Sequence, residues 1–226
     1  MRAVYNAALI AMEEPAPDCP LCPRLKAYRD DNRVKQPAWF NAPVPSFGER
    51  NARLLIVGLA PGVSGANRTG RPFTGDFAGE LLYGTLTKFG FAKGKYEARP
   101  DDGLTLVDCR ITNAVRCVPP ENKPTPEEAK TCRIFLHATL EGMKELKVIL
   151  ALGRIAHEAT LRAFGQKLNG FAFAHGARHA MPRALTLFDS FHCSRYNTNT
   201  GKLTTEMFEA VFAEVRRTLV PAFNGS

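Results

Sequence analysis

The chain has 226 residues, of which 45% are hydrophobic, and its 30 basic and 22 acidic side chains give a formal net charge of +8. This length fits a single domain over residues 1–226 with an N-terminal arm at 1–18, and no run approaches the roughly 20 apolar residues of a membrane-spanning helix. Early acidic residues and the missing small-residue cleavage site argue against a signal peptide, so we expect a cytoplasmic protein. The basic surplus favours a nucleic-acid partner, although a basic enzyme would explain it equally well.

The first half of the chain predicts two helices on either side of a buried strand. Residues 19–33 predict a short helix, and the Pro-rich residues 37–48 predict an extended loop. The apolar run at 53–58 predicts a strand. A helix is expected from about 76 to 89, because Gly90 suits its C-terminal end.

The second half alternates further strands with helices. Apolar runs predict core strands at 110–115, 147–152 and 185–188, with a short edge strand at 171–174. Helices are expected at 125–142, 155–164 and 205–219. The alternation predicts an α/β fold, namely a single three-layer α/β/α domain with a central, four-stranded, mainly parallel sheet.

The helix at 125–142 has the clearest start signal. Thr125 suits the N-cap, Pro126 suits the first helical position, and Glu128 is placed to complete a capping box. The preceding residues, 119–124, are too rich in proline for regular structure.

Two polar loops follow the first and last predicted core strands, at the ends where open α/β sheets bind ligands. The second loop, 192–201, begins with His192. The first loop, 59–76, is rich in glycine and carries four side chains of interest: Arg68, Arg71, Phe73 and Asp76. It has neither GxGxxG nor GxxxxGK[ST] spacing, so it suits a polyanion with a planar group better than a dinucleotide.

Asn113 lies in the second predicted strand, RITNAV, where its amide needs a partner. A structural hydrogen bond is one interpretation. The amide also offers one acceptor and two donors, which complement the O4 and N3–H edge of uracil, so a binding role stays open.

Six cysteines are present, and in a cytoplasmic protein they indicate metal ligands or buried thiols more than disulfides. Two pairs are suited to ligation: Cys19 with Cys22, and Cys117 with Cys132. Four thiolates suit a 4Fe–4S cluster or a structural zinc ion, and the residues alone do not separate the two. We expect the other two, Cys109 and Cys193, to be buried thiols.

Three motifs together resemble one known family. They are GLAPG with GANRTGRPFTGD, then RITNAVRCVPPENKPTPEEAKTC, then HCSRYNTNTGKLT. In this order and spacing the chain resembles the iron–sulfur uracil-DNA glycosylases of bacteria and archaea, most closely family 5, the UDGb type. The resemblance covers roughly residues 19 to 215.

The resemblance implies a monofunctional glycosylase that flips a damaged nucleotide out of DNA and hydrolyses its N-glycosidic bond, which starts base excision repair. The implied substrate is uracil, with hypoxanthine, xanthine and hydroxymethyluracil as further candidates. The implied partner is double-stranded DNA containing such a base, and we expect a monomer. The alternative from another class is a non-catalytic iron–sulfur or zinc protein that binds nucleic acid.

The family's base-binding residues map onto this sequence one by one. His192 matches the histidine that donates to the uracil O2, Phe73 matches the aromatic that stacks on the base, and Asn113 matches the asparagine that recognises its edge. The implied pocket also uses three positions of the first motif: Gly58, Ala60 and Gly62.

The catalytic acid is implied less directly. Family 4 has a glutamate where this chain has Leu59, and Asp76 matches the carboxylate proposed for family 5. Asp76 would orient the attacking water or balance the sugar's positive charge, although it also stands where a helix N-cap belongs. Many family members have His-Gly-Gly-Asn where this chain has Ser64-Gly65-Ala66-Asn67.

The resemblance also implies a cofactor and a DNA surface. Cys19, Cys22, Cys117 and Cys132 match the four ligands of the family's 4Fe–4S cluster, for which we expect a structural role. Candidate phosphate contacts are Arg68, Arg71 and Lys202. The second loop, with Arg195, Tyr196 and Asn197, is expected to enter the minor groove. A solvated surface charge is the alternative for each basic residue.

Overall fold

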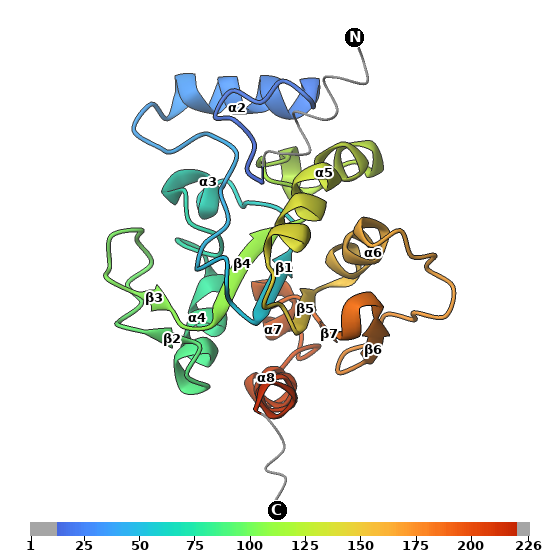
Figure 1. Ribbon diagram of the computed structural model, residues 1–226. Helices are drawn as coiled ribbons and strands as arrows, with labels where there is room; N and C mark the ends of the chain where they lie inside the picture. Colours follow the sequence, from blue (N-terminus) through green and yellow to red (C-terminus); the bar gives the residue numbers. More distant parts are fainter. Residues whose placement is uncertain (1–12, 221–226) are drawn as a thin grey trace, which may run out of the picture.

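The computed structural model describes residues 13–220, so most of the expected N-terminal arm lies outside the described residues. The helices and strands follow one another in this order (Figure 1): α2 (Pro23–Lys35), β1 (Leu54–Gly58), α3 (Ala66–Thr69), α4 (Phe77–Lys88), β2 (Ala92–Lys93), β3 (Thr105–Leu106), β4 (Cys109–Asn113), η1 (Pro120–Asn122), α5 (Pro126–Gly142), β5 (Val148–Leu152), α6 (Arg154–Ala163), β6 (Arg178–Met181), η2 (Pro182–Ala184), β7 (Leu185–Ser190), α7 (Arg195–Asn199) and α8 (Thr205–Leu219). Within the described residues, no helix is long and apolar enough to cross a membrane.

The central sheet confirms the α/β prediction. Its strand order is β4-β1-β5-β7-β6, and the first four strands are parallel to one another. These four are the core strands expected from the apolar runs. β6 is a fifth strand that pairs antiparallel with β7.

The edge strand was expected at the wrong place. Residues 171–174 form no strand, and the antiparallel edge is β6 instead. The alternation in Phe-Ala-Phe-Ala indicates a strand, but its two rings pack against histidines: Phe171 against His179, and Phe173 against His157. Here the alternation of phenylalanine and alanine reflects side-chain packing, and the segment forms no backbone hydrogen bonds of a β-ladder.

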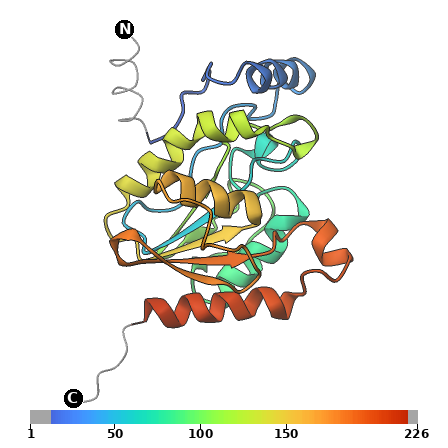
Figure 2. The same ribbon diagram turned by 90° about the vertical axis from the view of Figure 1, so that its right-hand side faces the viewer.

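Two helical layers enclose the sheet, as Figure 2 shows. The side chains of Leu54 and Ile56 pack toward α4 and α8, whereas those of Leu55 and Val57 pack toward α5 and α6. All four are fully buried. Because both faces are covered, the strand is continuously apolar, as parallel strands generally are.

Helix α2 lies over the N-terminal part of α5, where Leu25 and Phe135 share a small core with Val115 (Figure 1). The predicted capping box of α5 is present: the Glu128 amide donates to the Thr125 hydroxyl, and the Thr125 amide donates to the Glu128 carboxylate. Arg24 of α2 pairs with the same carboxylate at 2.7 Å, which joins the two helices.

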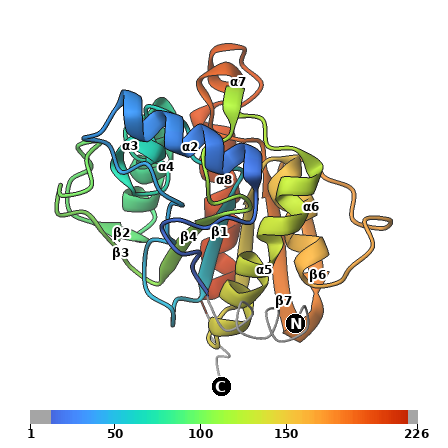
Figure 3. The same ribbon diagram turned by 90° about the horizontal axis from the view of Figure 1, so that it is seen from above.

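The carboxyl edge of the sheet collects the polar loops. Gly58 and Asn113 stand side by side at the ends of β1 and β4, and β7 ends two residues before His192. The loops contain two short helices that the sequence did not predict, α3 and α7, and Figure 3 shows α7 projecting from the body of the molecule. Helices of four or five residues carry too little periodicity to be recognised.

Candidate active site

A cavity of about 640 Å³ opens at the carboxyl edge of the sheet. The loop after β1, the start of α4 and the segment after β7 form its walls. A smaller recess of about 40 Å³ shares Ala60, Gly62, Asp76 and His192 with it and reaches Phe73 and Asn113. The structure thus brings Ala60, Gly62, Phe73, Asn113 and His192 into one pocket, whereas Gly58 does not line it and instead packs against the Phe73 and Asn113 side chains.

Phe73 and His192 lie face to face at the inner end of this pocket. Their ring centroids are 5.8 Å apart and their planes differ by 28°. Phe73 is buried, and its backbone takes a left-handed φ of 53°. The Phe73 and Asn113 side chains can both lie against β1 because residue 58 is glycine. A Cβ at this position would lie 2.6 Å from the Phe73 Cζ and 2.4 Å from the Asn113 Oδ1.

Asn113 is buried, and its Oδ1 has no hydrogen-bond partner within the described part of the chain. The structural hydrogen bond considered for it from the sequence is therefore not present at this oxygen. A buried carbonyl without a partner is costly unless a ligand satisfies it. The position is suited to a donor on a bound base.

Asp76 occupies the N-cap position of α4, yet its side chain forms no capping hydrogen bond. Its Oδ1 is buried and has no partner among residues 13–220. Burial raises the pKa of Asp76, and the nearby amides of Gly79 and Ala78 offset part of that rise. The carboxylate lines the pocket and also lies beside the first amides of α4.

His192 lies half-buried in the pocket wall, and desolvation lowers its pKa to about 4. It is therefore neutral at physiological pH, with one ring N–H to donate and one ring nitrogen to accept. The Asn197 side chain donates to the His192 backbone carbonyl at 2.8 Å. Asn197 thus holds the histidine segment from within, while its expected contact with DNA stays a prediction.

The four cysteines expected as ligands gather between α2 and the start of α5. All are free thiols; the Arg116 amide lies 3.3 Å from the Cys132 Sγ, and the Arg29 guanidinium 3.6 Å from the Cys117 Sγ. Cys19 and Cys22 complete the small core that these residues form. Cys109 and Cys193 are buried thiols elsewhere, as predicted.

The arrangement of these sulfurs can be compared with what each of the two candidate metal groups requires. Among the described residues, the cysteines include no three whose Sγ atoms all lie within 4.8 Å of one another. A tetrahedral zinc ion with bonds of about 2.3 Å holds its sulfur ligands only about 3.8 Å apart. The wider arrangement fits an iron–sulfur cubane held by four thiolates.

Arg71 does not lie on the surface as expected. Its side chain is 5% exposed and forms two hydrogen bonds, of 2.8 and 2.7 Å, with the Asp102 carboxylate. A buried, fully paired guanidinium is not available to a phosphate, so the expected DNA contact is wrong for this residue. The other candidate contacts lie exposed near the cavity or on the loop after it: Arg68, Arg195, Tyr196 and Lys202.

Three residues near the site were not singled out from the sequence. Asn122 lines the cavity from η1 with a left-handed φ of 57°. Tyr96 and Asp102 support the pocket from a loop between β2 and β3. No local motif marks them, because their roles depend on contacts with distant segments.

The comparisons with known proteins agree with this geometry. The family model of the uracil DNA glycosylase superfamily matches residues 45–216. A type-5 uracil-DNA glycosylase of Thermus thermophilus is 47% identical over 205 residues, covering 88% of this chain and 93% of that protein. A type-5 uracil-DNA glycosylase of Pyrobaculum aerophilum is 38% identical over 198 residues, covering 86% of each.

A type-4 uracil-DNA glycosylase of Pyrobaculum aerophilum is 35% identical over 151 residues, covering 66% of this chain and 63% of that protein. The fold, the pocket and these matches define a member of the uracil DNA glycosylase superfamily, a class of hydrolases that act on N-glycosyl bonds. The type-5 relatives match over much more of the chain than the type-4 protein does. Within the superfamily, the chain belongs to the type-5 uracil-DNA glycosylases.

Proposed function

We propose that this protein hydrolyses the N-glycosidic bond of deoxyuridine in double-stranded DNA and so starts base excision repair. The supporting observation is the single pocket that contains Phe73, Asn113, Asp76 and His192. An enzyme of this kind must extract the nucleotide from the helix, bind the base, and stabilise charge on both departing fragments.

Base binding uses the inner end of the pocket. Phe73 provides the face on which the flipped base stacks, and the Asn113 Oδ1, which lacks a partner within the described residues, accepts the N3–H of uracil. The backbone of Ala60 and Gly62 lets the base approach closely, and Gly58 makes room for the Phe73 and Asn113 side chains that hold it. The Phe73 ring excludes water from one face of the base, and the hydrogen bond to Asn113 selects a base with the matching polar edge.

Departure of the base uses His192. The uracil leaves as an anion, and a ring N–H aimed at O2 stabilises the charge that develops there. Because its pKa is about 4, His192 donates as a neutral imidazole and keeps its proton. Its effect is strongest in a pocket from which water is excluded.

Asp76 completes the reaction on the sugar side. The sugar acquires oxocarbenium character, and a carboxylate nearby balances that positive charge and orients the attacking water. The Asp76 Oδ1 is buried and has no partner among residues 13–220, so it is available to accept a hydrogen bond from the attacking water. The unpartnered Oδ1 supports a catalytic role for the carboxylate.

We propose that the lesion range extends to other deaminated bases, including hypoxanthine, xanthine and hydroxymethyluracil. The supporting observation is the outer cavity of about 640 Å³, which adjoins the recess lined by Phe73 and Asn113 and leaves room beside it for a base larger than a pyrimidine. The exposed residues Arg68, Arg195 and Lys202 would bind phosphates, and Tyr196, 74% exposed on α7, would enter the gap left by the flipped base.

We further propose that Cys19, Cys22, Cys117 and Cys132 hold a 4Fe–4S cluster. The wide sulfur spacing supports this choice over zinc. The bound cluster would supply a covalent cross-link between α2 and the start of α5, and the glycosidic hydrolysis needs no electron transfer. Purified protein should absorb near 400 nm and contain iron and acid-labile sulfide; a colourless protein with bound zinc would contradict the assignment.

The activity is tested by incubating the purified protein with a uracil-containing duplex, followed by alkali to cleave abasic sites. A duplex of the same sequence with thymine is the matched control. We expect strand cleavage for the uracil duplex after alkali and none before it, because the enzyme has no lyase step. Binding of the duplex without abasic sites would favour the alternative of a non-catalytic nucleic-acid-binding protein.

A further inference from the structure

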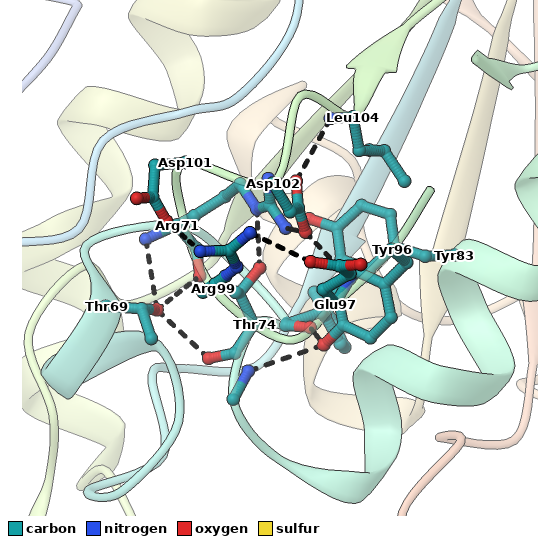
Figure 4. A network of polar contacts seen from close by, with 12 residues as sticks. Thr69, Arg71, Thr74, Tyr83, Tyr96, Glu97, Arg99, Asp101, Asp102 and Leu104 are labelled. Atoms are coloured by element: carbon teal, nitrogen blue, oxygen red, sulfur yellow. Dashed lines mark hydrogen bonds and ion pairs between the residues drawn. The ribbon is translucent and has the colours of Figure 1, made fainter. Parts of the chain in front are cut away.

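A network of polar contacts surrounds the buried side chains of Arg71, Tyr83 and Asp102 (Figure 4). It connects loop 94–104, between β2 and β3, with segment 71–76, which carries Phe73 and Asp76. The loop and the segment are far apart in the sequence, and nothing in the proposed chemistry uses the loop directly. The contacts show what the loop does for the pocket.

Asp102 anchors the loop. Its carboxylate accepts the amide of Glu97 at 3.0 Å and the amide of Leu104 at 3.0 Å, and it also receives both hydrogen bonds from Arg71. The Asp102 side chain is 0% exposed, and the Arg71 guanidinium beside it holds the pKa of Asp102 well below its usual range. This pair is a two-pronged, charge-assisted link between the loop and the pocket segment.

Aromatic rings surround the guanidinium of Arg71. It lies 5.3 Å from the ring centroids of Phe47 and Tyr83 and 5.8 Å from that of Tyr96. The two tyrosine rings stack with centroids 4.7 Å apart. Cation–π contacts and stacking fix the direction in which each tyrosine hydroxyl points.

Those hydroxyls bind the backbone of the pocket segment. The Tyr83 hydroxyl donates to the Pro72 carbonyl at 2.6 Å, and the Tyr96 hydroxyl donates to the Phe73 carbonyl at 3.2 Å. The Gly75 amide donates to the Tyr96 hydroxyl at 3.4 Å. The two tyrosines therefore hold the backbone on both sides of the Phe73 ring.

Phe73 needs this support, because its φ of 53° is a conformation that phenylalanine rarely adopts. Its carbonyl also lies against α4, where a Cβ at Gly79 would stand 1.9 Å from the Phe73 oxygen and 2.2 Å from the Tyr96 hydroxyl. The peptide is thus enclosed between the helix and the tyrosine. Small shifts of either would rotate the ring in the pocket.

We infer that Tyr96 is a positioning residue which, through its hydroxyl, holds Phe73 in the orientation required to stack on the flipped base. The inference rests on the proposed function, because the orientation of Phe73 matters only if a flipped base stacks on its ring. Tyr96 itself does not touch the base. Loop 94–104, which Asp102 closes through its hydrogen bonds, positions Tyr96 beside the pocket segment.

The test is a double-mutant cycle measured by single-turnover uracil excision. Tyr96→Phe keeps the ring that stacks on Tyr83 and removes only the hydroxyl, and Phe73→Ala removes the platform. We expect Tyr96→Phe to lower the excision rate about tenfold in the wild-type background and to have almost no effect in the Phe73→Ala background. The matched control is Tyr28→Phe on α2, which should leave the rate unchanged.

A second variant approaches the same peptide from the other side. Gly79→Ala places a methyl group against the backbone carbonyl of residue 73 and the Tyr96 hydroxyl, and it should lower excision in the wild-type background. Melting temperatures establish that each variant is folded. Equal rate losses from Tyr96→Phe in both backgrounds, or no loss in the wild type, would overturn the inference. If the wild-type protein releases no uracil at all, it is the proposed function that fails.

Discussion

Two glycines at the carboxyl edge of the sheet determine how closely the reacting side chains approach one another. A Cβ at Gly58 would collide with Phe73 and Asn113, and a Cβ at Gly65 would lie 2.3 Å from the Asp76 Oδ2. The glycine-rich composition of the first loop thus creates room for side chains, in addition to any backbone contact with a ligand.

Asp76→Asn tests the role of the carboxylate. The amide has nearly the same size but no charge, so single-turnover uracil excision should fall at least tenfold, as expected when a general base is removed. Because burial raises the pKa of Asp76, wild-type excision should decline on acidification sooner than an ordinary aspartate would allow. Asp101→Asn, on the exposed part of loop 94–104, is the control. An unchanged rate in Asp76→Asn would leave the carboxylate without a catalytic role.

At the level of single residues, the sequence predicted the members of the pocket better than their surroundings. Phe73, Asn113 and His192 meet as expected, because Asn113 ends β4 while Phe73 and His192 follow β1 and β7, and these parallel strands end at one edge. Arg71 was misassigned because its partner, Asp102, is 31 residues away in sequence. A charge that is neutralised by a distant residue has the same local pattern as a charge that faces DNA.

Among the elements, His157 of α6 joins loop 164–177 to β7 through a buried contact with Asp189. The Asp189 carboxylate lies 2.8 Å from the His157 Nδ1 and 3.0 Å from the His179 Nε2, and the His157 Nε2 lies 2.9 Å from the Phe171 carbonyl. Burial alone would lower the pKa of His157, but Asp189 outweighs it and the pKa is raised. The His157 imidazole thus ties the loop to the sheet through hydrogen bonds from both ring nitrogens.

The hydrogen bond between His157 and Asp189 predicts a pH-dependent stability. The pKa of folded His157 exceeds the unfolded value of about 6.5, so its stabilisation is complete below about pH 6.5 and is lost as pH rises through the folded pKa. His157→Gln should lower the melting temperature by about 5 °C at pH 6 and by less at pH 9. His137→Gln, at an exposed position of α5, is the control. A difference that is equal at both pH values would contradict the assignment.

The elements themselves were predictable where local signals were strong. The capping box of α5 and the four apolar runs gave helix and strand positions within a few residues. The edge strand was not predictable, since residues 171–174 alternate for a different physical reason and β6 has a mixed composition, Arg-His-Ala-Met. Pairing with β7, which is a tertiary contact, decides which segment forms the edge.

On the scale of the whole molecule, an exposed basic side chain lies beside the cavity. The cavity lies at the carboxyl edge, and Arg195 stands at its rim, 5.3 Å from the Phe77 ring centroid. Arg195→Ala should reduce the salt dependence of duplex binding by about one unit of slope if it contacts one phosphate. Lys147→Ala, next to the amino end of β5, should leave the slope unchanged. A slope unaltered by Arg195→Ala would place the DNA elsewhere.

The central claim is that the pocket at the carboxyl edge binds a flipped uracil and releases it. The most direct measurement is single-turnover release of uracil from a duplex by the wild-type protein and by Asn113→Ala. The account predicts release by the wild type and a loss of about 100-fold in the variant, with duplex binding retained, because the base loses its hydrogen-bonded edge. Release at the wild-type rate by Asn113→Ala would contradict the account.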